Sequence, residues 1–211
     1  MVLNNIDMAS LTKQRRMIPE IRRLLQPIYG DALKDHANVK IEANRPPVEG
    51  MGGTNSFFFT HEWPESRDAN MSCMNDKEAD MVVGLFDYLV MNGVEPDKIT
   101  VLTFYNGQRK TIIKKLRHHR NFRCQPTLNV VTVDSYQGEE NDIVLLSLVR
   151  SNKKHKIGFL EVDNRVCVAL SRAKRGFYLF GNAELLACES GKTSGCFEIQ
   201  QVANQMARYL G

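Results

Sequence analysis

The chain has 211 residues, of which 43% are hydrophobic and 25% are charged, and its formal net charge at pH 7 is +4. This composition predicts a soluble globular domain with a full core. No apolar run approaches the roughly 18 residues that span a bilayer, and the N-terminus lacks the apolar region of a signal peptide, so we expect an intracellular protein of the nucleus or cytoplasm with no membrane partner. The five cysteines are scattered without a C-x-x-C pair, which predicts reduced thiols and no metal site.

The first half of the chain contains two expected helices separated by an irregular stretch. The periodicity of PEIRRLLQPIY predicts a helix over 19–29 that ends at Gly30. Residues 31–75 are rich in turn signals, and we interpret them as an insertion or irregular segment whose only strand is SFFFT. Asn75 then stands three residues before Glu78, a spacing compatible with a capping box. We expect a long helix here, ended by Asn92-Gly93, with these residues facing inward: Met81, Val82, Leu85, Phe86 and Leu89.

In the second half, strands and helices alternate. Strands are predicted for ITVLTFY, LNVVTV, DIVLLSLV and GFYLFG, and helices for NGQRKTIIKKLRHHR, for the segment around NRVCVALSRAK, and for about 197–210. Alternation of this kind predicts an α/β fold with a mainly parallel central sheet covered by helices on both faces.

A charged hinge lies between two of these strands, in VVTVDSYQGEENDIVLLSLVRS at 130–151. A hairpin would need only a short turn, so the extra acids suggest a ligand. Gly138 lets backbone N–H groups approach an anion, and a neighbouring carboxylate can accept hydrogen bonds from ribose hydroxyls. Because ligands of parallel sheets bind at the carboxyl ends of the strands, we expect the hinge and the start of the SRAK segment at that edge. A solvated acidic loop is the alternative.

Two arginines favour the ligand interpretation. Arg16 in QRRM and Arg172 in ALSRAK each stand in a short basic motif close to an element boundary. Guanidinium groups hold phosphate oxygens in a fixed geometry. Further basic clusters occur in KKLRHHR and RSNKKHK, and such clusters suit a polyanion, although either arginine taken alone is more often a surface charge.

The chain resembles the superfamily 1 helicases in four motifs that keep the family's order and approximate spacing: QRRM at 14–17, TFYNGQR at 103–109, TVDSYQGEEND at 132–142 and VALSRAK at 168–174. The resemblance extends to the up-frameshift-like RNA helicases. Within them, QGEENDIVLLSLVRSN and GFLEVDNRVCVALSRAK are most similar to the NFX-type zinc-finger helicases linked to small-RNA silencing. The resemblance to these helicases implies a RecA-like three-layer α/β/α fold. It also implies a second RecA-like domain at 1–187, with a flexible loop and C-terminal helix at 188–211 packing on the same domain.

The resemblance also implies roles for individual residues. Arg16 and Arg172 would be the catalytic arginines that reach the triphosphate. ATP with Mg²⁺ would be the cofactor, with the Mg²⁺ ligands on a first RecA-like domain. The nucleotide-binding residues would be Gln14, Arg15, Gln137, Gly138 and Glu140. The contacts to single-stranded RNA would come from Thr103, Asn106, Thr132 and Ser135. The chain departs from its relatives at Arg15, where they commonly carry an aromatic or imidazole ring.

A phosphate-cradling G-x-x-x-x-G-K-[ST] loop is missing from the sequence. The nearest approach is ESGKTSG at 189–195, in which Leu186 occupies the position of the first glycine, and we interpret this stretch as a loop. We therefore expect an excised motor domain that hydrolyses no ATP alone. Its partners would be RNA, the first RecA-like domain of the same parent and a silencing factor such as an RNA-dependent RNA polymerase.

Two other hypotheses stay open. One is a non-catalytic protein-interaction module of a silencing complex that retains helicase motifs and binds a partner through SFFFTHEWPESRD and the basic patches. The presence of Arg16, Gly138, Glu140 and Arg172 argues against such decay. The other is a stand-alone nucleotide-binding protein, which lacks the phosphate loop that it would need.

Overall fold

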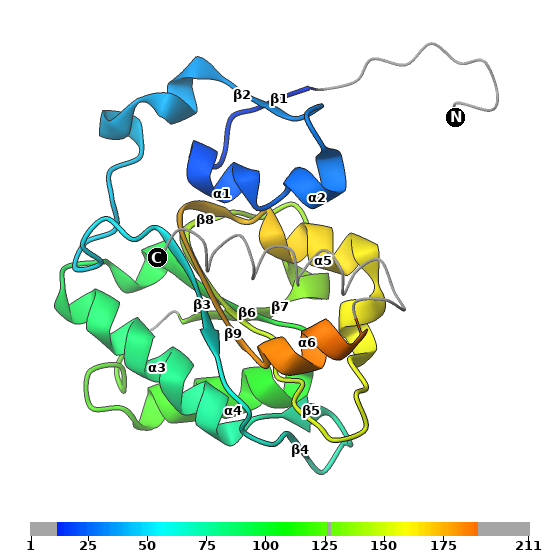
Figure 1. The fold of residues 1–211 in the computed structure, drawn as a ribbon. Helices are drawn as coiled ribbons and strands as arrows, with labels where there is room; N and C mark the ends of the chain where they lie inside the picture. Colours follow the sequence, from blue (N-terminus) through cyan, green and yellow to red (C-terminus); the bar gives the residue numbers. More distant parts are fainter. Residues whose placement is uncertain (1–11, 126–127, 190–211) are drawn as a thin grey trace.

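A five-stranded parallel sheet forms the centre of the molecule in the computed structural model, which describes residues 12–125 and 128–189 (Figure 1). Every neighbouring pair in this sheet is parallel, which confirms the predicted sheet type. The strands, in spatial order, are β3 Ser56–Thr60, β9 Ala173–Gly181, β8 Asn141–Ser147, β6 Ile99–Thr103 and β7 Asn129–Thr132. Within the described residues, no helix combines the length and the apolarity needed to cross a membrane.

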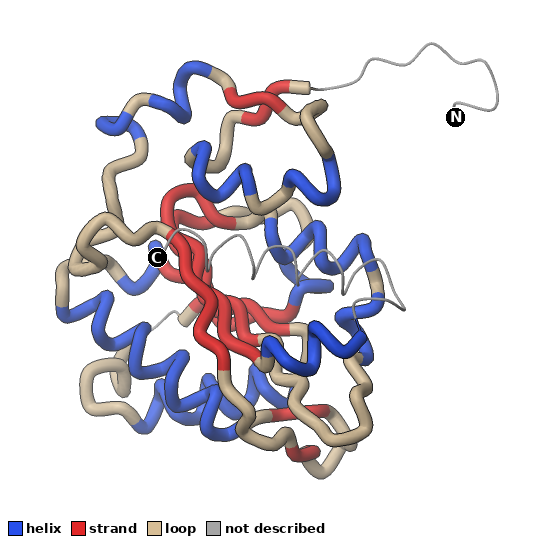
Figure 2. Tube along the Cα trace, viewed as in Figure 1, coloured by secondary structure: helices blue, strands red, loops and turns tan. Residues whose placement is uncertain are grey.

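Helices cover both faces of the sheet (Figures 1 and 2). On one face lie α3 Asp76–Met91 and α4 Asn106–His118; on the other lie α1 Pro19–Arg23, α2 Gln26–Tyr29, α5 Asp163–Leu170 and α6 Ala183–Glu189. Successive strand residues alternate between the two cores: Ile143 and Leu145 face α3 and α4, whereas Val144 and Leu146 face the α5 side. The predicted RecA-like three-layer α/β/α fold is therefore confirmed.

The helix predicted over 19–29 is broken in the structure. It ends as α1 at Arg23 and restarts as α2 at Gln26, while Leu24 and Leu25 remain buried. Pro27 explains the break, because it has no backbone N–H to donate and its ring clashes with the carbonyl group four residues earlier. Gly30 ends α2 with a φ of +54°, as its position suggested.

The first turn of α3 forms only half of the predicted capping box. The side chain of Asn75 accepts a hydrogen bond from the backbone N–H of Glu78 at 3.2 Å. The carboxylate of Glu78 does not return this contact, because it binds Ser147, Val149 and His61 instead. The prediction that Met81 faces inward is wrong, since its side chain is 37% exposed on the outer side of the helix.

Short strands and shifted boundaries account for the other differences. Within 31–75, β2 Lys34–Asp35 pairs with β1 Lys13–Gln14, and β4 Ser66–Arg67 pairs with β5 Cys73–Met74. Two-residue strands carry no periodicity from which a sequence could predict them. The helix expected through residue 174 ends as α5 at Leu170, and β9 begins at Ala173. The predicted helix at 197–210 and all but the first residue of ESGKTSG lie outside the described residues.

A close approach at Gly107 gives a testable expectation for stability. A Cβ atom at this position would lie 2.9 Å from the carbonyl oxygens of both Ser72 and Cys73, which are backbone atoms. We expect Gly107→Ala to lower the free energy of unfolding by about 1 to 3 kcal/mol in urea denaturation. Gly84→Ala is the matched helical control, because nothing lies within 4 Å of its added Cβ. It should raise stability by about 0.5 to 1 kcal/mol, and equal stability of the two variants would contradict the steric argument.

Candidate functional site

Gln14 shapes the turn that presents Arg16. Its side-chain oxygen accepts the backbone N–H groups of Arg16 and Met17, both at 2.9 Å. Its amide nitrogen donates to the carbonyl oxygen of Met17 at 2.8 Å and to Asp35 at 2.6 Å. Gln14 is thus committed to contacts within the chain, whereas the neighbouring Arg15 is exposed.

Arg16 meets the acidic hinge at Glu140. The Arg16 guanidinium donates to the Glu140 carboxylate and, at 2.7 Å, to the carbonyl oxygen of Ser171. The Lys174 ammonium lies 3.3 Å from the other carboxylate oxygen. Partial burial raises the pKa of Glu140, but the hydrogen bonds and charges of Arg16 and Lys174 outweigh it and hold the pKa below its ordinary value. Glu140 is therefore an ionised partner for two cations.

Arg172 is held beside this pair and is only 9% exposed. Its guanidinium donates to the carbonyl oxygens of Val168 at 2.8 Å and Glu139 at 3.0 Å, and to the Ser171 hydroxyl at 2.8 Å. Burial lowers the pKa of Arg172, and the positive charge of Arg16 lowers it further. Two guanidinium groups therefore converge on the hinge, and an added anion would relieve their repulsion.

The arginine cluster, defined here as Arg16, Glu140, Arg172 and Lys174, lies at the amino edge of the sheet. The prediction that the hinge sits at the carboxyl edge is confirmed for its first part, where Asp134 and Ser135 follow the end of β7, but it is wrong for Glu140. A 3₁₀ turn, Val133–Tyr136, carries the chain back from the end of β7, so that Glu140 stands just before the start of β8. The Asn141 N–H donates to the carbonyl oxygen of Arg172 at 3.1 Å. A connection between parallel strands runs from the carboxyl end of one strand to the amino end of the next. Glu139 and Glu140 lie at the end of this connection that leads into β8.

Gly138 and Gln137 lie on the exposed part of the hinge. The φ of Gly138 is +91°, a backbone conformation that residues other than glycine rarely adopt. No atom lies within 4 Å of a Cβ atom added at this position. Glycine is thus required by the backbone conformation, and the space beside it is open to a ligand.

A second candidate site, the carboxyl-edge groove, encloses about 680 Å³ at the opposite edge of the sheet. Three of the four predicted RNA-binding residues line it: Asn106 at the start of α4, Thr132 at the end of β7, and Ser135 in the turn that follows. The hydroxyl groups of Thr132 and Ser135 lie 3.0 Å apart and cap the 3₁₀ turn. Thr103 is the exception, because it is fully buried and its hydroxyl accepts the Tyr105 N–H at 3.4 Å.

The groove also contains functional candidates to which the sequence analysis gave no role. Arg109 lines the groove and donates to the carbonyl oxygen of Val130 at 2.9 Å. Its position within the motif TFYNGQR was a signal that could have identified it. Asp134 and Phe159 also line the groove. No local pattern marks these two as neighbours of the groove, because 25 residues separate them in the sequence.

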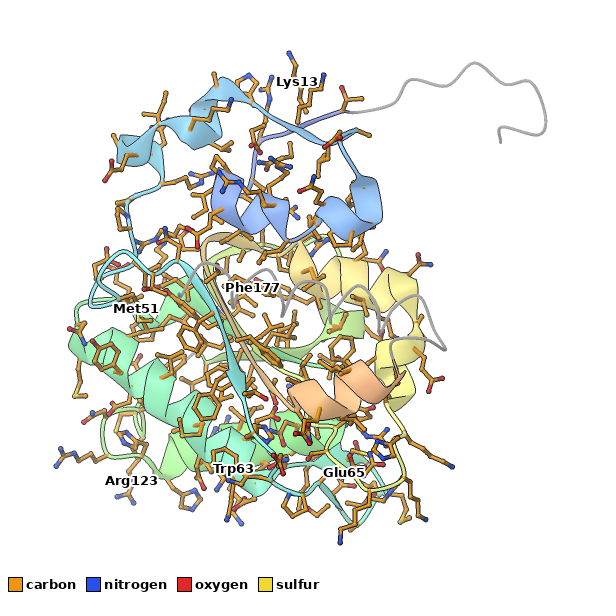
Figure 3. The ribbon with its side chains drawn as sticks, in the orientation of Figure 1. Lys13, Met51, Trp63, Glu65, Arg123 and Phe177 are labelled. Atoms are coloured by element: carbon orange, nitrogen blue, oxygen red, sulfur yellow. The ribbon has the colours of Figure 1, made fainter. Side chains whose placement is uncertain are left out.

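The two sites lie at opposite edges of the sheet and are joined by one segment. Residues 132–140 run from the groove to the arginine cluster. Figure 3 shows the separation of the two edges, with Lys13 near the amino edge, Glu65 near the carboxyl edge and Phe177 between them. A bidentate pair, Asp134 with Arg165 at 2.8 and 3.0 Å, ties this segment to α5, which ends two residues before Arg172.

Comparison with known proteins shows that the sequence of this chain is similar to those of helicases. The AAA domain family matches residues 1–184. The helicase required for RNAi-mediated heterochromatin assembly 1 of Schizosaccharomyces pombe is 49% identical over 187 residues, which cover 89% of this chain and 18% of that protein. NFX1-type zinc finger-containing protein 1 of Homo sapiens is 46% identical over 186 residues, 87% of this chain and 9% of that protein.

A more distant relative belongs to the up-frameshift-like group. The regulator of nonsense transcripts 1 homolog of Arabidopsis thaliana is 38% identical over 134 residues, which cover 62% of this chain and 11% of that protein. The chain thus spans less than a fifth of the length of each of these relatives.

Proposed function

We propose that this chain, which belongs to the AAA domain family and is related to the up-frameshift-like and NFX-type helicases, is the second RecA-like domain and C-terminal motor half of an ATP-dependent RNA helicase. In this role it supplies arginines to the nucleotide, a hinge that senses the nucleotide, and part of a channel for single-stranded RNA. The convergence of Arg16 and Arg172 on the hinge is the observation that carries the proposal.

The arginine cluster suits a triphosphate better than a neutral ligand. Two guanidinium groups at one exposed hinge offer planar donor sets to phosphate oxygens. Gly138 leaves room for a phosphate beside the hinge, and the neighbouring Gln137 is exposed, as is Arg15 beside Arg16. Mg²⁺ and the phosphate cradle would come from a first RecA-like domain, so that ATP is held between two domains. Gln14 contributes by fixing the position of Arg16.

The carboxyl-edge groove supplies the RNA side of the proposal. Asn106, Thr132 and Ser135 present amide and hydroxyl groups of the kind that contact phosphates and sugars without reading the sequence. Arg109 adds a positive charge to the same wall. The name of the Schizosaccharomyces pombe relative favours RNA silencing as the process. A silencing factor such as an RNA-dependent RNA polymerase is the partner that we propose for such a process.

Binding of single-stranded RNA by this chain tests the proposal directly. We expect a modest affinity that falls steeply with salt and depends little on sequence, because phosphate contacts dominate it. Arg109→Gln should reduce the slope of log affinity against log salt by about 1. Arg123→Gln is the control, since Arg123 is an exposed arginine that does not line the groove. Fluorescence anisotropy across a salt series measures both slopes. Affinity that does not change with salt would favour the interaction-module hypothesis.

A further inference from the structure

Three hollows follow one another along the carboxyl edge of the sheet. The groove shares Ser72 and Phe159 with a second hollow of about 370 Å³. We call this second hollow the aromatic pocket. It shares Arg67 and Arg150 with a third hollow of about 370 Å³, whose lining includes Lys153, Lys154 and Lys156. A polar groove, an aromatic pocket and a basic surface thus form a continuous path.

The aromatic pocket differs in chemistry from the hollows on either side. Phe159 is 46% exposed and Met71 is 66% exposed, and both line this pocket. Because these large apolar side chains are exposed to water, a flat apolar ligand that covers them removes apolar surface from water, which favours binding. Asn70 and Ser72 on the same lining can supply hydrogen bonds at the edge of such a ligand.

The aromatic wall is fixed in place before any ligand arrives. The Phe159 N–H donates to the Tyr105 hydroxyl at 3.2 Å, and the two rings stack with centroids 5.2 Å apart. Arg150 donates to the same hydroxyl at 3.3 Å and to Glu65 at 2.8 Å. Burial raises the pKa of Tyr105, which keeps its hydroxyl neutral. The Arg165 guanidinium lies 4.6 Å from the Phe159 ring centre.

The third hollow presents lysines from an ordered loop. The side-chain oxygen of Asn152 accepts the backbone N–H groups of Lys154 at 3.2 Å and Lys156 at 3.1 Å. The side-chain nitrogen of Asn152 donates to the Lys156 carbonyl oxygen at 2.8 Å and to Glu65 at 3.0 Å. Glu65 therefore anchors both the aromatic wall and the lysine loop, which fixes the position of one relative to the other.

We propose that the aromatic pocket takes one unstacked base of a single-stranded RNA whose backbone enters along the groove and leaves over the lysine loop. The inference rests on the proposed function and adds a base-binding position to it. Phosphates suit the polar and basic hollows, whereas the face of a base suits Phe159 and Met71. The pocket should accept any base, because stacking on an aromatic ring uses a face that all bases share.

The test compares two probes on the 211-residue chain, namely a fluorescently labelled oligouridylate and a strand of the same length with abasic sugars. We expect Phe159→Ala to weaken binding of the oligouridylate at least about fivefold and to leave binding of the abasic strand unchanged. Phe159→Tyr should keep the affinity of the parent chain, since its ring still stacks. Equal weakening for both probes would mean that Phe159 supports the fold only, and would overturn the proposal.

A second pair of variants guards against misfolding of Phe159→Ala. Met71 and Met91 are both 66% exposed, but only Met71 lines the aromatic pocket. Met71→Ala should weaken binding of the oligouridylate, while Met91→Ala should not. If Arg109→Gln weakens binding and neither pocket variant does, the base position is overturned and the proposed RNA function stands. If the chain binds neither probe, the proposed function itself fails.

Discussion

Arg172→Ala should lower the kcat of RNA-stimulated ATP hydrolysis by roughly 10³-fold or more in a protein that joins this domain to a first RecA-like domain. Arg172 is positioned by its donations to Val168, Glu139 and Ser171, so its guanidinium is oriented before the two domains close. An arginine that meets the γ-phosphate only in the closed state stabilises the transition state more than the bound nucleotide. Nucleotide affinity should therefore change much less than kcat.

Lysine substitutions provide the matched comparison. Arg172→Lys keeps the charge but loses the planar donor set, so it should restore little activity. Arg175 is equally buried, at 8% exposure, but its ion pairs are with Glu49 and Asp142 and with no member of the arginine cluster, so Arg175→Lys should leave kcat nearly unchanged. Steady-state ATPase assays and nucleotide-binding titrations separate the two effects. Turnover of Arg172→Ala within about twofold of the parent would reject the catalytic role and favour the interaction module.

Glu78→Ala should lower the free energy of unfolding by about 3 to 5 kcal/mol, because it removes the centre of a buried polar network. Glu78 is fully buried and accepts hydrogen bonds from the Ser147 hydroxyl, from the Val149 N–H at 3.0 Å and from His61 at 2.7 Å. Its loss leaves these three donors buried without the carboxylate. Val149 also has a φ of +73°, which is strained for a β-branched residue, so its N–H contact helps to hold that conformation.

Urea denaturation of two further variants separates the network from a general effect of losing an acid. Glu78→Gln keeps one carbonyl acceptor and should be less destabilising than Glu78→Ala. Glu95 is exposed and makes no side-chain cap to the following turn, so Glu95→Ala should change stability by no more than about 0.5 kcal/mol. A loss below about 1 kcal/mol for Glu78→Ala would show that water or other residues replace the carboxylate.

The regular elements of the core could be predicted because their signals are local. The continuous apolar run DIVLLSLV is typical of a strand covered on both faces, and the structure buries Ile143, Val144, Leu145 and Leu146. The helical spacing of Val82, Phe86 and Leu89 marks the inward face of α3, and all three are buried. The sequence prediction missed the exposure of Met81 and the helix break at Pro27 for different reasons. Apolarity alone did not tell which helix face Met81 occupies, whereas the proline signal was in the sequence but was outweighed by a periodic pattern.

Part of the candidate site could also be predicted. Hydrogen bonds connect Gln14 to Arg16, Arg16 to Glu140, and Arg172 to the adjacent Glu139, and Asn106, Thr132 and Ser135 share one groove. Their roles toward a nucleotide and RNA stay predictions. Thr103 does not join that groove, because the last residue of a central strand lies within the sheet and its side chain is buried.

The fold class, the family and the residue types of the site could be inferred from short stretches of sequence, because alternation, helical spacing and motifs are local properties. The places where these residues meet depend on how distant segments pack together. Arg16 reaches Glu140 across 124 positions of sequence, and Met71 and Phe159 line one pocket from two distant loops. These contacts follow from the strand order β3-β9-β8-β6-β7, in which neighbours in space are not neighbours in the chain. The same order places the start of β8 beside the start of β9, and so puts the acidic hinge at the amino edge of the sheet.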